Sequence, residues 1–511
     1  MTTVLGSAEA QQVGDILITG GRIVDGTGAP ERAADVLVRG DRIVFIGDAA
    51  AAHVTAKRTL QAKGMVVAPG FIDPHTHTFE DLSSTDAARR RNAAYLAQGV
   101  TTVLTGNDGG GPTDVGASLA QWTRTGIGTN AALYVGFGSV RQALLGMSSA
   151  PATPEQTAKM RDIVRAAMAH GAVGMSAGLY YAPQSYASTE EVISVARDVG
   201  PMGGVYDTHL RDESSYSIGL LGAIGEAIRI GRETNTPVNI SHIKALGVDV
   251  WGKSDSAIAM VRAARSAGQR VTADQYPYDA SGSSVGASLL PRWAEAGGRD
   301  SLRKRLTDGA TRARISSEMS ENLRRRGGAA SLLITDHDAR GYGGKRLNEI
   351  ATARGVSPLD AAIEIILSGD ASVASFNMNA EDIARFMTAD FTMTGSDGSD
   401  GHPRKYGTFP KKYREYVRSR GLLTLAEFMH RSSQMPAEVF GLKQRGILAE
   451  GAFADILVFD PAKFSDQSTY EAPTRLAVGA DYVLVNGRLA VDGGRVTDLL
   501  AGRALARERT P

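Results

Sequence analysis

Cysteine is absent from the 511-residue chain. Disulfides, thiolate metal ligands and cysteine nucleophiles are therefore excluded, because each of them requires a thiol group. Any metal that the protein binds must be held by nitrogen and oxygen atoms. Long apolar runs are missing as well: nowhere do about 18 apolar residues follow one another, as a membrane-spanning helix requires. We therefore expect no membrane partner.

A strong charge of either sign is also lacking. The chain has 56 Lys and Arg against 55 Asp and Glu, a formal net charge of +1, and 42% hydrophobic residues. Such a chain has neither a basic stripe for nucleic acid nor an acidic tail, so we expect a globular protein whose partner is a small molecule. The first fifteen residues contain no basic segment followed by an apolar run, which favours a cytoplasmic location over secretion. Composition leaves the oligomeric state open.

Alternating apolar residues predict short antiparallel strands at both ends of the chain. Ile16 and Ile18 near the N-terminus follow a period of two. The same pattern returns in Ala454–Phe459 and in Tyr482–Val485, which is followed by Asn-Gly, a strong hairpin signal. We expect the two ends, residues 1–66 and 445–511, to build one small β-sandwich domain together.

Between the two ends, apolar runs alternate with helical stretches. The eight runs are VVAPGFID, VTTVLTG, AALYVGFG, AVGMSAGL, GVYDTH, VNISH, RVTADQYP and FTMTGSD. Buried parallel strands have continuous apolar sequences because helices cover one face and the barrel interior covers the other. The pattern predicts an α/β fold with a (β/α)8 TIM-like barrel over residues 67–444. An Arg- and Gly-rich segment over about residues 281–345 interrupts the repeat and is expected to be an inserted lid.

Six residues with metal-binding side chains stand at the ends of these runs. They are His75, His77, Asp108, His209, His242 and Asp397. Because the carboxyl ends of barrel strands face one cavity, we expect the six side chains to share a rim. The His-x-His spacing of the first two points both rings to the same side of an extended segment. Imidazole and carboxylate without thiolate suit Zn²⁺, with Mn²⁺, Co²⁺ and Ni²⁺ as alternatives, and one or two ions are expected.

With these motifs in place, the chain resembles the N-acyl-D-amino-acid deacylases (D-aminoacylases) of the amidohydrolase superfamily over nearly its whole length. The resemblance rests on the order and spacing of GFIDPHTH, GVTTVLTGNDGG, GAVGMSAGLYYAPQSYASTEE, GGVYDTHLRDE, VNISHIKALGVDVWGKS, DQYPYDASGSS, GSDGSDGHPRKYGTFPKKY and GILAEGAFADILVFDP. It implies a metal-dependent hydrolase with a barrel, a small β-sandwich and a lid after the seventh strand. By this likeness His75 and His77 hold the more open metal position, His209 and His242 the tighter one, and Asp397 is the catalytic carboxylate.

The expected reaction is the hydrolysis of a linear amide bond, from an N-acyl-D-amino acid to a D-amino acid and a carboxylate. A bound Zn²⁺ lowers the pKa of its water to ~7 and polarises a carbonyl, so metal-bound hydroxide is the expected nucleophile. Asp397 would take a proton as the nucleophile attacks and pass it to the departing amine nitrogen.

Asp108 departs from the family pattern. Similar proteins commonly carry GNCG after the second strand, with the Cys as a metal ligand, whereas this chain has Gly106-Asn107-Asp108-Gly109. No lysine stands at the end of the fourth strand to provide a carboxylated bridge. We expect Asp108 to bridge the ions and to change the metal preference, because carboxylate is harder than thiolate. The alternative is that Asp108 only forms an Asx turn before the glycines.

A substrate carboxylate requires cationic and hydroxyl partners. Lys244 lies two residues beyond His242, on the same face of an extended segment. The family resemblance implies that Lys244, Tyr276, Ser283 and Arg404 hold the carboxylate and that Tyr181 also contacts the substrate. The alternative is that these residues have no role in substrate binding. The lysine and the arginine would then be solvated cations, and the tyrosines would only contribute to packing.

Other functions fit the sequence less well. An amidohydrolase of another N-acyl amino acid or a dipeptide stays open, whereas a cyclic amide, as in dihydropyrimidinase, is disfavoured by the missing fourth-strand lysine. A non-catalytic scaffold is disfavoured because the four histidines and Asp397 are retained. The glycines of GNDGGG do not form a phosphate-binding P-loop, because no lysine follows them in the required arrangement.

Overall fold

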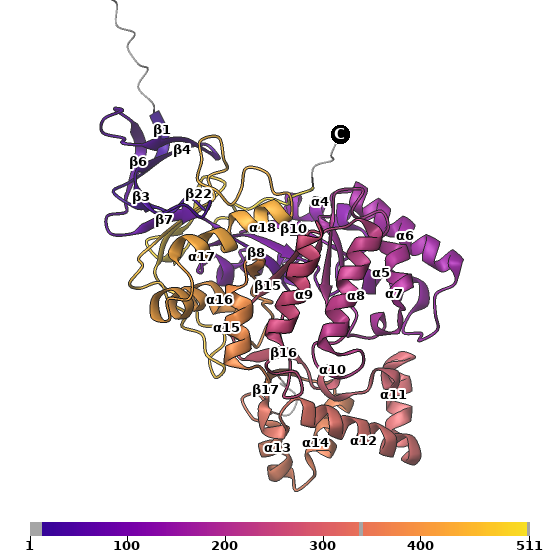
Figure 1. Ribbon diagram of the computed structural model, residues 1–511. Coiled ribbons are helices and arrows are strands. Elements are labelled where there is room, and N and C mark those ends of the chain that lie inside the picture. The colour runs from indigo at the N-terminus through magenta and orange to yellow at the C-terminus, as the bar shows by residue number, and fades with distance from the viewer. Residues whose placement is uncertain (1–12, 337–340, 508–511) are drawn as a thin grey trace, which may run out of the picture.

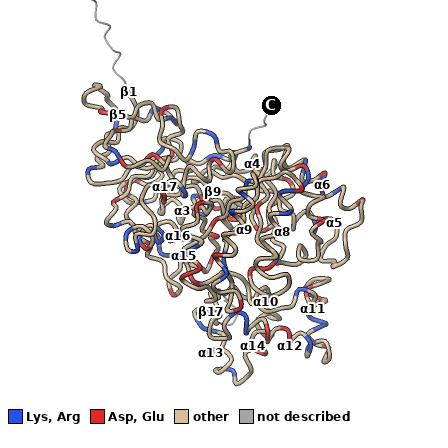
Figure 2. The backbone as a smooth tube through the Cα atoms, in the orientation of Figure 1, with Lys and Arg blue, Asp and Glu red and all other residues tan. Residues whose placement is uncertain are grey.

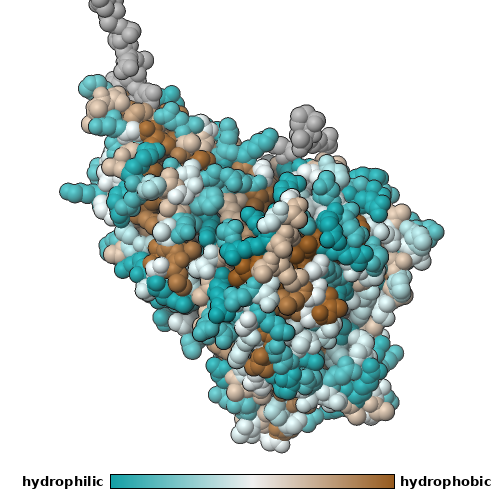
Figure 3. Space-filling model, in the orientation of Figure 1, coloured by the Kyte–Doolittle hydropathy of each residue, from teal (hydrophilic) through white to brown (hydrophobic). Residues whose placement is uncertain are grey.

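The computed structural model describes residues 13–336 and 341–507 (Figure 1). Most of the segment on which the expectation about secretion rests therefore lies outside the described residues, as do four residues of the expected insertion. Each helix in the described part of the chain is too short or too polar to cross a bilayer. Positive and negative residues are interspersed along the chain (Figure 2). On the face shown in Figure 3, hydrophobic residues lie in separate patches between hydrophilic ones.

Each of the eight apolar runs contains a parallel strand. The strands are β8 (Phe71–Thr76), β9 (Val100–Thr105), β10 (Asn130–Leu133) with the short β11 (Val135–Gly136), β12 (Gly174–Gly178), β13 (Val205–His209), β14 (Val238–Ile240), β15 (Val271–Gln275) and β19 (Thr392–Thr394). They pair in the orders β10-β9-β8 and β11-β12-β13-β14-β15-β19. An isolated parallel bridge between Thr76 and Gly398 joins the end of β8 to the chain just after β19. The first and last parallel strands therefore meet, in a TIM-barrel-like arrangement.

Helices follow the parallel strands and cover them on the outside (Figure 1). They include α4 (Val115–Thr125), α5 (Phe137–Leu145), α6 (Pro154–Ala169), α7 (Thr189–Ala196), α8 (Gly219–Thr234), α9 (Ser254–Ser266), α15 (Ala380–Thr388), α16 (Arg404–Lys412), α17 (Leu425–Ser432) and α18 (Gln434–Val439). In α8 the buried residues Leu220, Ile224, Ala227 and Ile230 recur every three or four positions, which places one apolar stripe against the strands. Three short helices, α1 (Phe79–Leu82), α2 (Ala87–Arg90) and α3 (Ala93–Leu96), lie between β8 and β9.

The two ends of the chain share one sheet. β7 (Val66–Pro69) pairs antiparallel with β20 (Ile456–Phe459), in a seven-stranded sheet completed by β2 (Arg22–Ile23), β3 (Arg32–Ala33), β21 (Ala480–Val485), β22 (Arg488–Asp492) and β23 (Arg495–Val496). A second sheet contains only N-terminal strands: β1 (Val13–Thr19), β4 (Asp35–Arg39), β5 (Arg42–Gly47) and β6 (Thr55–Gln61). Asn486 and Gly487 both have positive φ, 48° and 77°, and connect β21 to β22 as the hairpin that Asn-Gly predicts.

A helical excursion separates β15 from β19 and lies at one end of the molecule (Figure 1). It begins with β16 (Ala280–Ser284), which pairs with β18 (Ser372–Phe376), and β18 also pairs with β17 (Leu332–Asp336). Its helices are α10 (Val285–Leu289), α11 (Gly298–Thr307), α12 (Gly309–Arg325), α13 (Leu347–Arg354) and α14 (Pro358–Leu367). Buried Leu306, Ile315, Ile350 and Ile363 belong to a hydrophobic cluster of its own. β16 brings its serines back to the end of the strands where the histidines lie.

Candidate metal centre

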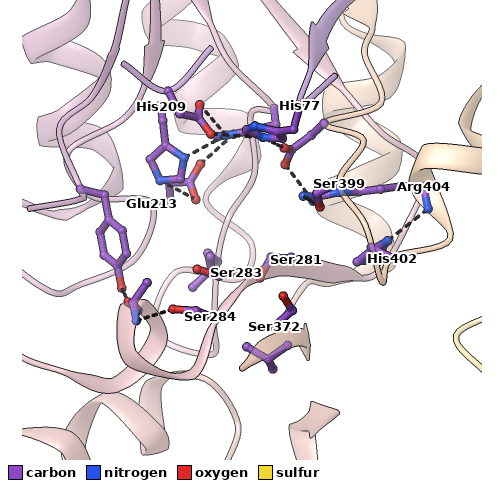
Figure 4. Close-up of a pocket in the computed structure, with 18 of the residues that line it drawn as sticks. His77, His209, Glu213, Ser281, Ser283, Ser284, Ser372, Ser399, His402 and Arg404 are labelled. Carbon is purple, nitrogen blue, oxygen red and sulfur yellow. Dashed lines mark hydrogen bonds and ion pairs between the residues drawn. The ribbon is translucent and has the colours of Figure 1, made fainter. Parts of the chain in front are cut away.

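The six predicted residues at the strand ends lie in or directly beneath one cavity of about 540 Å³. His209 is the last residue of β13, and His242 follows β14 by two positions. His75 is completely buried beneath the cavity. The cavity wall includes the other five: His77, Asp108, His209, His242 and Asp397. Figure 4 shows His77 and His209 on one side of this cavity and Ser281, Ser283, Ser284 and Ser372 on the opposite side. The topology thus assembles the cluster from segments far apart in the sequence.

Asp108 lies at the centre of the cluster. Its Oδ1 is 3.5 Å from His75 Nε2 and 3.6 Å from His242 Nε2, and its Oδ2 is 3.6 Å from His77 Nε2. One ligand atom each from His75, Asp108, His242 and Asp397 lies within 4.8 Å of the others. Within the described chain, His75 Nε2 and Asp108 Oδ1 are buried without a hydrogen-bond partner. Because buried polar atoms normally have partners, a cation fits these residues.

The pKa shifts in the cluster also show that its carboxylates favour a positive charge beside them. Burial opposes protonation of His75, but Asp108 and Asp397 outweigh it and raise the pKa of His75 to about 10. Burial and Lys244 oppose protonation of His242, yet Asp397 and Glu213 raise its pKa to about 9. Burial would raise the pKa of Asp108, but the neighbouring histidines hold it well below its usual range. A bound cation would supply the charge that protons supply in its absence.

Asp397 is ionised and held at both oxygens. Its Oδ2 lies 2.8 Å from Nη1 of the buried Arg404, and its Oδ1 lies 3.0 Å from His77 Nε2. Burial raises the pKa of Asp397, but Arg404 and then His242 outweigh burial and lower it. An ionised, oriented carboxylate next to a metal-binding cluster can accept a proton.

Three residues of the cluster have backbone conformations that are uncommon for side chains other than glycine. The φ angles are 56° at Asp108, 36° at His242 and 48° at Asp397. Residues in the left-handed region persist only where the surroundings enforce them, and they gather at functional sites. These three backbone positions aim side chains into the cavity just beyond the ends of β9, β14 and β19.

The structure does not show the Asx turn that was the alternative role for Asp108. Such a turn would require the N–H two residues on to donate to the Asp108 side chain. Gly110 N donates instead to Asn107 O, at 3.0 Å, and Gly109 N donates to Ser176 Oγ, at 3.1 Å. The turn after β9 is closed without the Asp108 carboxylate.

Glu213 is a member of the cluster that the sequence reasoning missed. It is 4% exposed, and its carboxylate contacts His209, His242 and Lys244. Burial opposes its ionisation, but Lys244 and then His209 lower its pKa below the usual range. The sequence offers one weak signal, a carboxylate four positions after His209 in HLRDE.

The predicted substrate residues also line the cavity, but two of them are already paired. Tyr181, Lys244, Tyr276, Ser283 and Arg404 all contribute to the wall. Lys244 Nζ lies 2.5 Å from Glu213, and Arg404 is paired with Asp397. Within the described chain, Tyr276 Oη is buried and has no hydrogen-bond partner. Tyr180, Tyr216, Arg326 and His402 line the cavity as well and were not predicted.

A buried polar network supports the cluster from beneath. Asn239 Nδ2 donates to Asp207 Oδ1 and to Asp274 Oδ2, each at 2.8 Å. Asn107 Nδ2 donates to Asp207 Oδ2 at 3.0 Å, and His242 N donates to Asp274 Oδ1 at 3.0 Å. These bonds tie the ends of several strands together, which fixes the positions from which the ligand side chains project.

Comparison with known proteins agrees with this site. Residues 58–198 and 305–491 match the model of the amidohydrolase family. The chain is 37% identical to a D-aminoacylase of Alcaligenes xylosoxydans xylosoxydans, over 96% of the chain and 98% of that protein. It is 33% identical to an N-acyl-D-aspartate deacylase of the same organism, over 99% of the chain and 97% of that protein. The solved structure of an N-acyl-D-glutamate deacylase from Bordetella bronchiseptica, complexed with zinc and a phosphonate mimic of the tetrahedral intermediate, matches with a TM-score of 0.82 and 31% identity. That match covers 97% of this chain and 100% of the other.

Proposed function

The chain belongs to the D-aminoacylase branch of the amidohydrolase family, and from this premise we propose that it hydrolyses N-acyl-D-amino acids to D-amino acids and carboxylates. Relatives with similar sequences are named as a D-aminoacylase, an N-acyl-D-aspartate deacylase and an N-acyl-D-glutamate deacylase. The observation that carries the proposal is the buried cluster around Asp108, in which His75 Nε2 and Asp108 Oδ1 have no hydrogen-bond partner within the described chain and lie next to an ionised Asp397.

Zn²⁺ is the proposed metal, in one or two ions, because the cluster offers only imidazole nitrogen and carboxylate oxygen. The residues that would hold it are His75, His77, Asp108, His209, His242 and Asp397. When bound, such an ion polarises the scissile carbonyl and lowers the pKa of water. The carboxylate of Asp108 faces three of the histidines and is therefore the proposed bridge.

Asp397 is the proposed proton carrier. Arg404 holds Oδ2, which leaves Oδ1 on the side of the histidines as the atom that takes a proton from the attacking water. Asp397 then passes that proton to the amide nitrogen, which cannot leave as an anion.

The substrate carboxylate is proposed to bind on the serine side of the cavity. Tyr276 Oη and Arg404 Nε are buried without hydrogen-bond partners in the described chain, so both can donate to an arriving carboxylate. Ser283 lies on the wall opposite His77 and His209 (Figure 4) and adds a hydroxyl. Lys244 and Tyr181 are the proposed contacts nearer the metal cluster.

We also infer the finer architecture from the strand order. The bridge from β8 to the segment after β19 supports a closed eight-stranded barrel, and the mixing of both chain ends in one hydrophobic cluster supports a β-sandwich. We also propose domain boundaries after residues 66 and 444, and an inserted lid over about residues 281–345.

A substrate screen tests the proposed function. The metal-loaded protein is assayed against N-acetyl-D- and N-acetyl-L-amino acids in pairs, with simple dipeptides and dihydropyrimidines alongside. We expect release of the amino acid from the D-series and little from the L-series. Hydrolysis of the cyclic amides alone would contradict the proposal.

A further inference from the structure

Three cationic side chains of lysine and arginine line the cavity, and one of them has no carboxylate beside it. Lys244 is paired with Glu213, and Arg404 is paired with Asp397. The third is Arg326, which directly follows α12. Arg326 is 2% exposed, and it forms no ion pair with a carboxylate of the described chain. Because a buried charge without a counter-charge is costly, such a group points to an anion that the cavity receives.

The contacts of Arg326 are all with uncharged groups. Its Nε donates to Ser288 O at 3.1 Å, and its Nη2 donates to Tyr180 Oη at the long distance of 3.4 Å. Its Nη1 lies 3.3 Å from the side-chain amide of Asn377. A guanidinium group has five N–H donors, so two of them remain for a further partner.

Arg431 shows how a buried arginine with a purely structural role is satisfied. It is 8% exposed and lies outside the cavity wall. Its two Nη groups donate to the carbonyl oxygens of Met387, Thr388 and Ala389 at the end of α15, at 2.8–3.2 Å. Arg326 has a single carbonyl partner, and that partner is bound by Nε. The Nη groups of Arg326 are therefore not used up in capping a helix.

Two tyrosines of the cavity wall stand beside Arg326. Tyr180 Oη donates to Ala287 O at 2.9 Å, so the proton of this hydroxyl is already used. Tyr216 Oη is buried without a hydrogen-bond partner in the described chain, and the centre of its ring is 5.9 Å from Arg326 Cζ. A guanidinium fork next to a hydroxyl that can donate suits a planar carboxylate.

Arg326 and Tyr216, which we call the second anion subsite, do not belong to the place proposed above for the α-carboxylate of the substrate. The ring of Tyr180 connects the subsite to the metal cluster: its centre is 5.7 Å from that of His209, and its hydroxyl accepts from Arg326. Arg404 lies instead over the ring of Tyr276, at 4.8 Å. Figure 4 shows His209 and Arg404 well apart along the cavity wall.

We propose that the second anion subsite binds a second carboxylate of the substrate, in addition to the α-carboxylate. The inference rests on the proposed function, because the scissile amide must lie at the metal cluster and the α-carboxylate near Arg404. The second carboxylate belongs either to the side chain of the amino acid or to the acyl group, since both extend from the scissile amide. A substrate with a neutral group there leaves the buried guanidinium without a counter-charge, so the subsite selects for dianionic substrates.

Two pairs of compounds of matched size test this inference and distinguish the two sources of the carboxylate. N-acetyl-D-glutamate and N-acetyl-D-glutamine differ in the charge of the side chain, whereas N-succinyl-D-leucine and N-pentanoyl-D-leucine differ in the charge of the acyl group. Initial rates with the metal-loaded protein give kcat/KM for each compound. We expect the dianion to be preferred in one of the pairs by roughly 10–100-fold, the range of a hydrogen bond to a charged group. The pair that shows the preference identifies the source.

Arg326→Met should remove this preference. The variant keeps the length of the side chain but not its charge, so kcat/KM for the preferred dianion should fall by about 10–100-fold, chiefly through KM, with little change for its neutral partner. Arg326→Lys keeps the charge without the fork and should retain part of the preference. Tyr216→Phe removes one neutral donor and should lose less than Arg326→Met.

Arg431→Met is the matched control, because it removes a buried arginine that forms no ion pair in the described chain and does not line the cavity. This variant should have a lower melting temperature, since three carbonyl oxygens lose their donor, and should keep the wild-type preference between the paired compounds. A loss of preference that is confined to Arg326→Met and Tyr216→Phe therefore cannot come from destabilisation of the fold.

Equal kcat/KM values within both pairs in wild type would overturn the inference, and this comparison does not depend on the folding of any variant. A preference that persists in Arg326→Met would overturn it as well. Hydrolysis of none of the four compounds would contradict the proposed function instead. The same compounds are then titrated calorimetrically into wild type and Arg326→Met, where the inference predicts tighter binding of a dianion by wild type alone, and equal affinities would overturn it.

Discussion

The strands carry a buried polar cluster at each end, and the two clusters differ in how well their atoms are satisfied. At the carboxyl ends, His75 Nδ1, His75 Nε2 and Asp108 Oδ1 have no hydrogen-bond partners within the described chain. The second cluster lies at the amino ends and is just as buried, with exposed fractions of 0–5%. It consists of Asn130, Arg445, Asp455 and Asn486. None of their fully buried side-chain nitrogen and oxygen atoms is without a hydrogen-bond partner.

The bonds of the second cluster, which we call the amino-end cluster, form a closed network. Asp455 accepts from Asn486 N at 2.8 Å, from Asn130 Nδ2 at 3.1 Å and from Arg445. Arg445 Nη2 donates to Asn486 Oδ1 at 3.0 Å, and Asn486 Nδ2 donates to Asn130 Oδ1 at 2.8 Å. These residues come from β10 and from the C-terminal region, so the network joins the parallel strands to the shared sheet.

The comparison shows how similar residue types serve different purposes. A fully satisfied network fixes one arrangement and stabilises it, whereas an under-satisfied cluster holds atoms ready for a group that the chain does not supply. This agrees with the general division of TIM-barrel-like folds, in which the carboxyl face carries chemistry and the amino face carries stability. Changes at the metal centre should therefore affect turnover, and changes in the amino-end cluster should affect unfolding.

Removal of the metal should have the largest effect on turnover. Dialysis against a chelator is expected to abolish hydrolysis, and stoichiometric Zn²⁺ should restore it, because the side chains around Asp108 cannot replace an ion that polarises the carbonyl and lowers the pKa of water. Metal content and turnover are measured on the same samples. Full activity in metal-free protein would contradict the assignment of the site.

Asp397→Asn should have the next largest effect. The substitution keeps the size of the side chain but removes the proton acceptor, so kcat should fall by about 10²–10⁴-fold. Metal content should remain near that of wild type because the histidines and Asp108 are unchanged. If kcat is unaffected, another group transfers the proton.

Substitutions of Asp108 should act first on the metal. Loss of a residue that hydrogen-bonds to a metal ligand typically weakens metal affinity by roughly 10–100-fold. Asp108→Ala removes a ligand itself, so it should weaken the affinity by at least that much, and turnover at limiting metal should fall with it. Asp108→Cys should keep an occupied site and shift the preference toward Zn²⁺ over Mn²⁺, because thiolate is softer than carboxylate. Affinities and turnover are compared with those of Asp108→Asn. Wild-type metal occupancy and rate in the Asn variant would remove Asp108 from the ligand set.

Much of the fold could be predicted because the decisive patterns are local. Continuous apolar runs marked all eight parallel strands, and Asn486-Gly487 marked the hairpin between β21 and β22. The pairing of β16 with β18 could not be predicted, because it joins Ala280 to Phe376 and no local pattern specifies a partner so far along the chain. The helices of the excursion were missed for a related reason: they bury their apolar residues against one another rather than against the parallel strands.

The positions of the metal-binding residues could be predicted from topology, since parallel strands bring their carboxyl ends together. Glu213 could not, because it lies in an irregular segment between β13 and α8, where no periodicity shows which way a side chain points. The spacing of His242 and Lys244 placed both on one face. It contained no information about the carboxylate that Lys244 would meet there.

Asp455→Ala should leave turnover almost unchanged and still destabilise the protein. It removes one partner of a buried ion pair and leaves Arg445 and Asn130 without an acceptor, which should lower the free energy of unfolding by about 3–5 kcal/mol. Urea unfolding of metal-free protein is the suitable measurement, because bound metal would add its own stabilisation.

The double variant Asp455→Leu/Arg445→Met should lose less free energy of unfolding than the sum of the losses in Asp455→Leu and Arg445→Met, since it leaves no unpaired buried charge. Because the amino-end cluster lies at the far ends of the strands, kcat and metal affinity of the folded fraction should match wild type. A fall of tenfold or more in either would show that the two clusters are coupled, and that the division between a stabilising face and a chemical face does not hold in this protein.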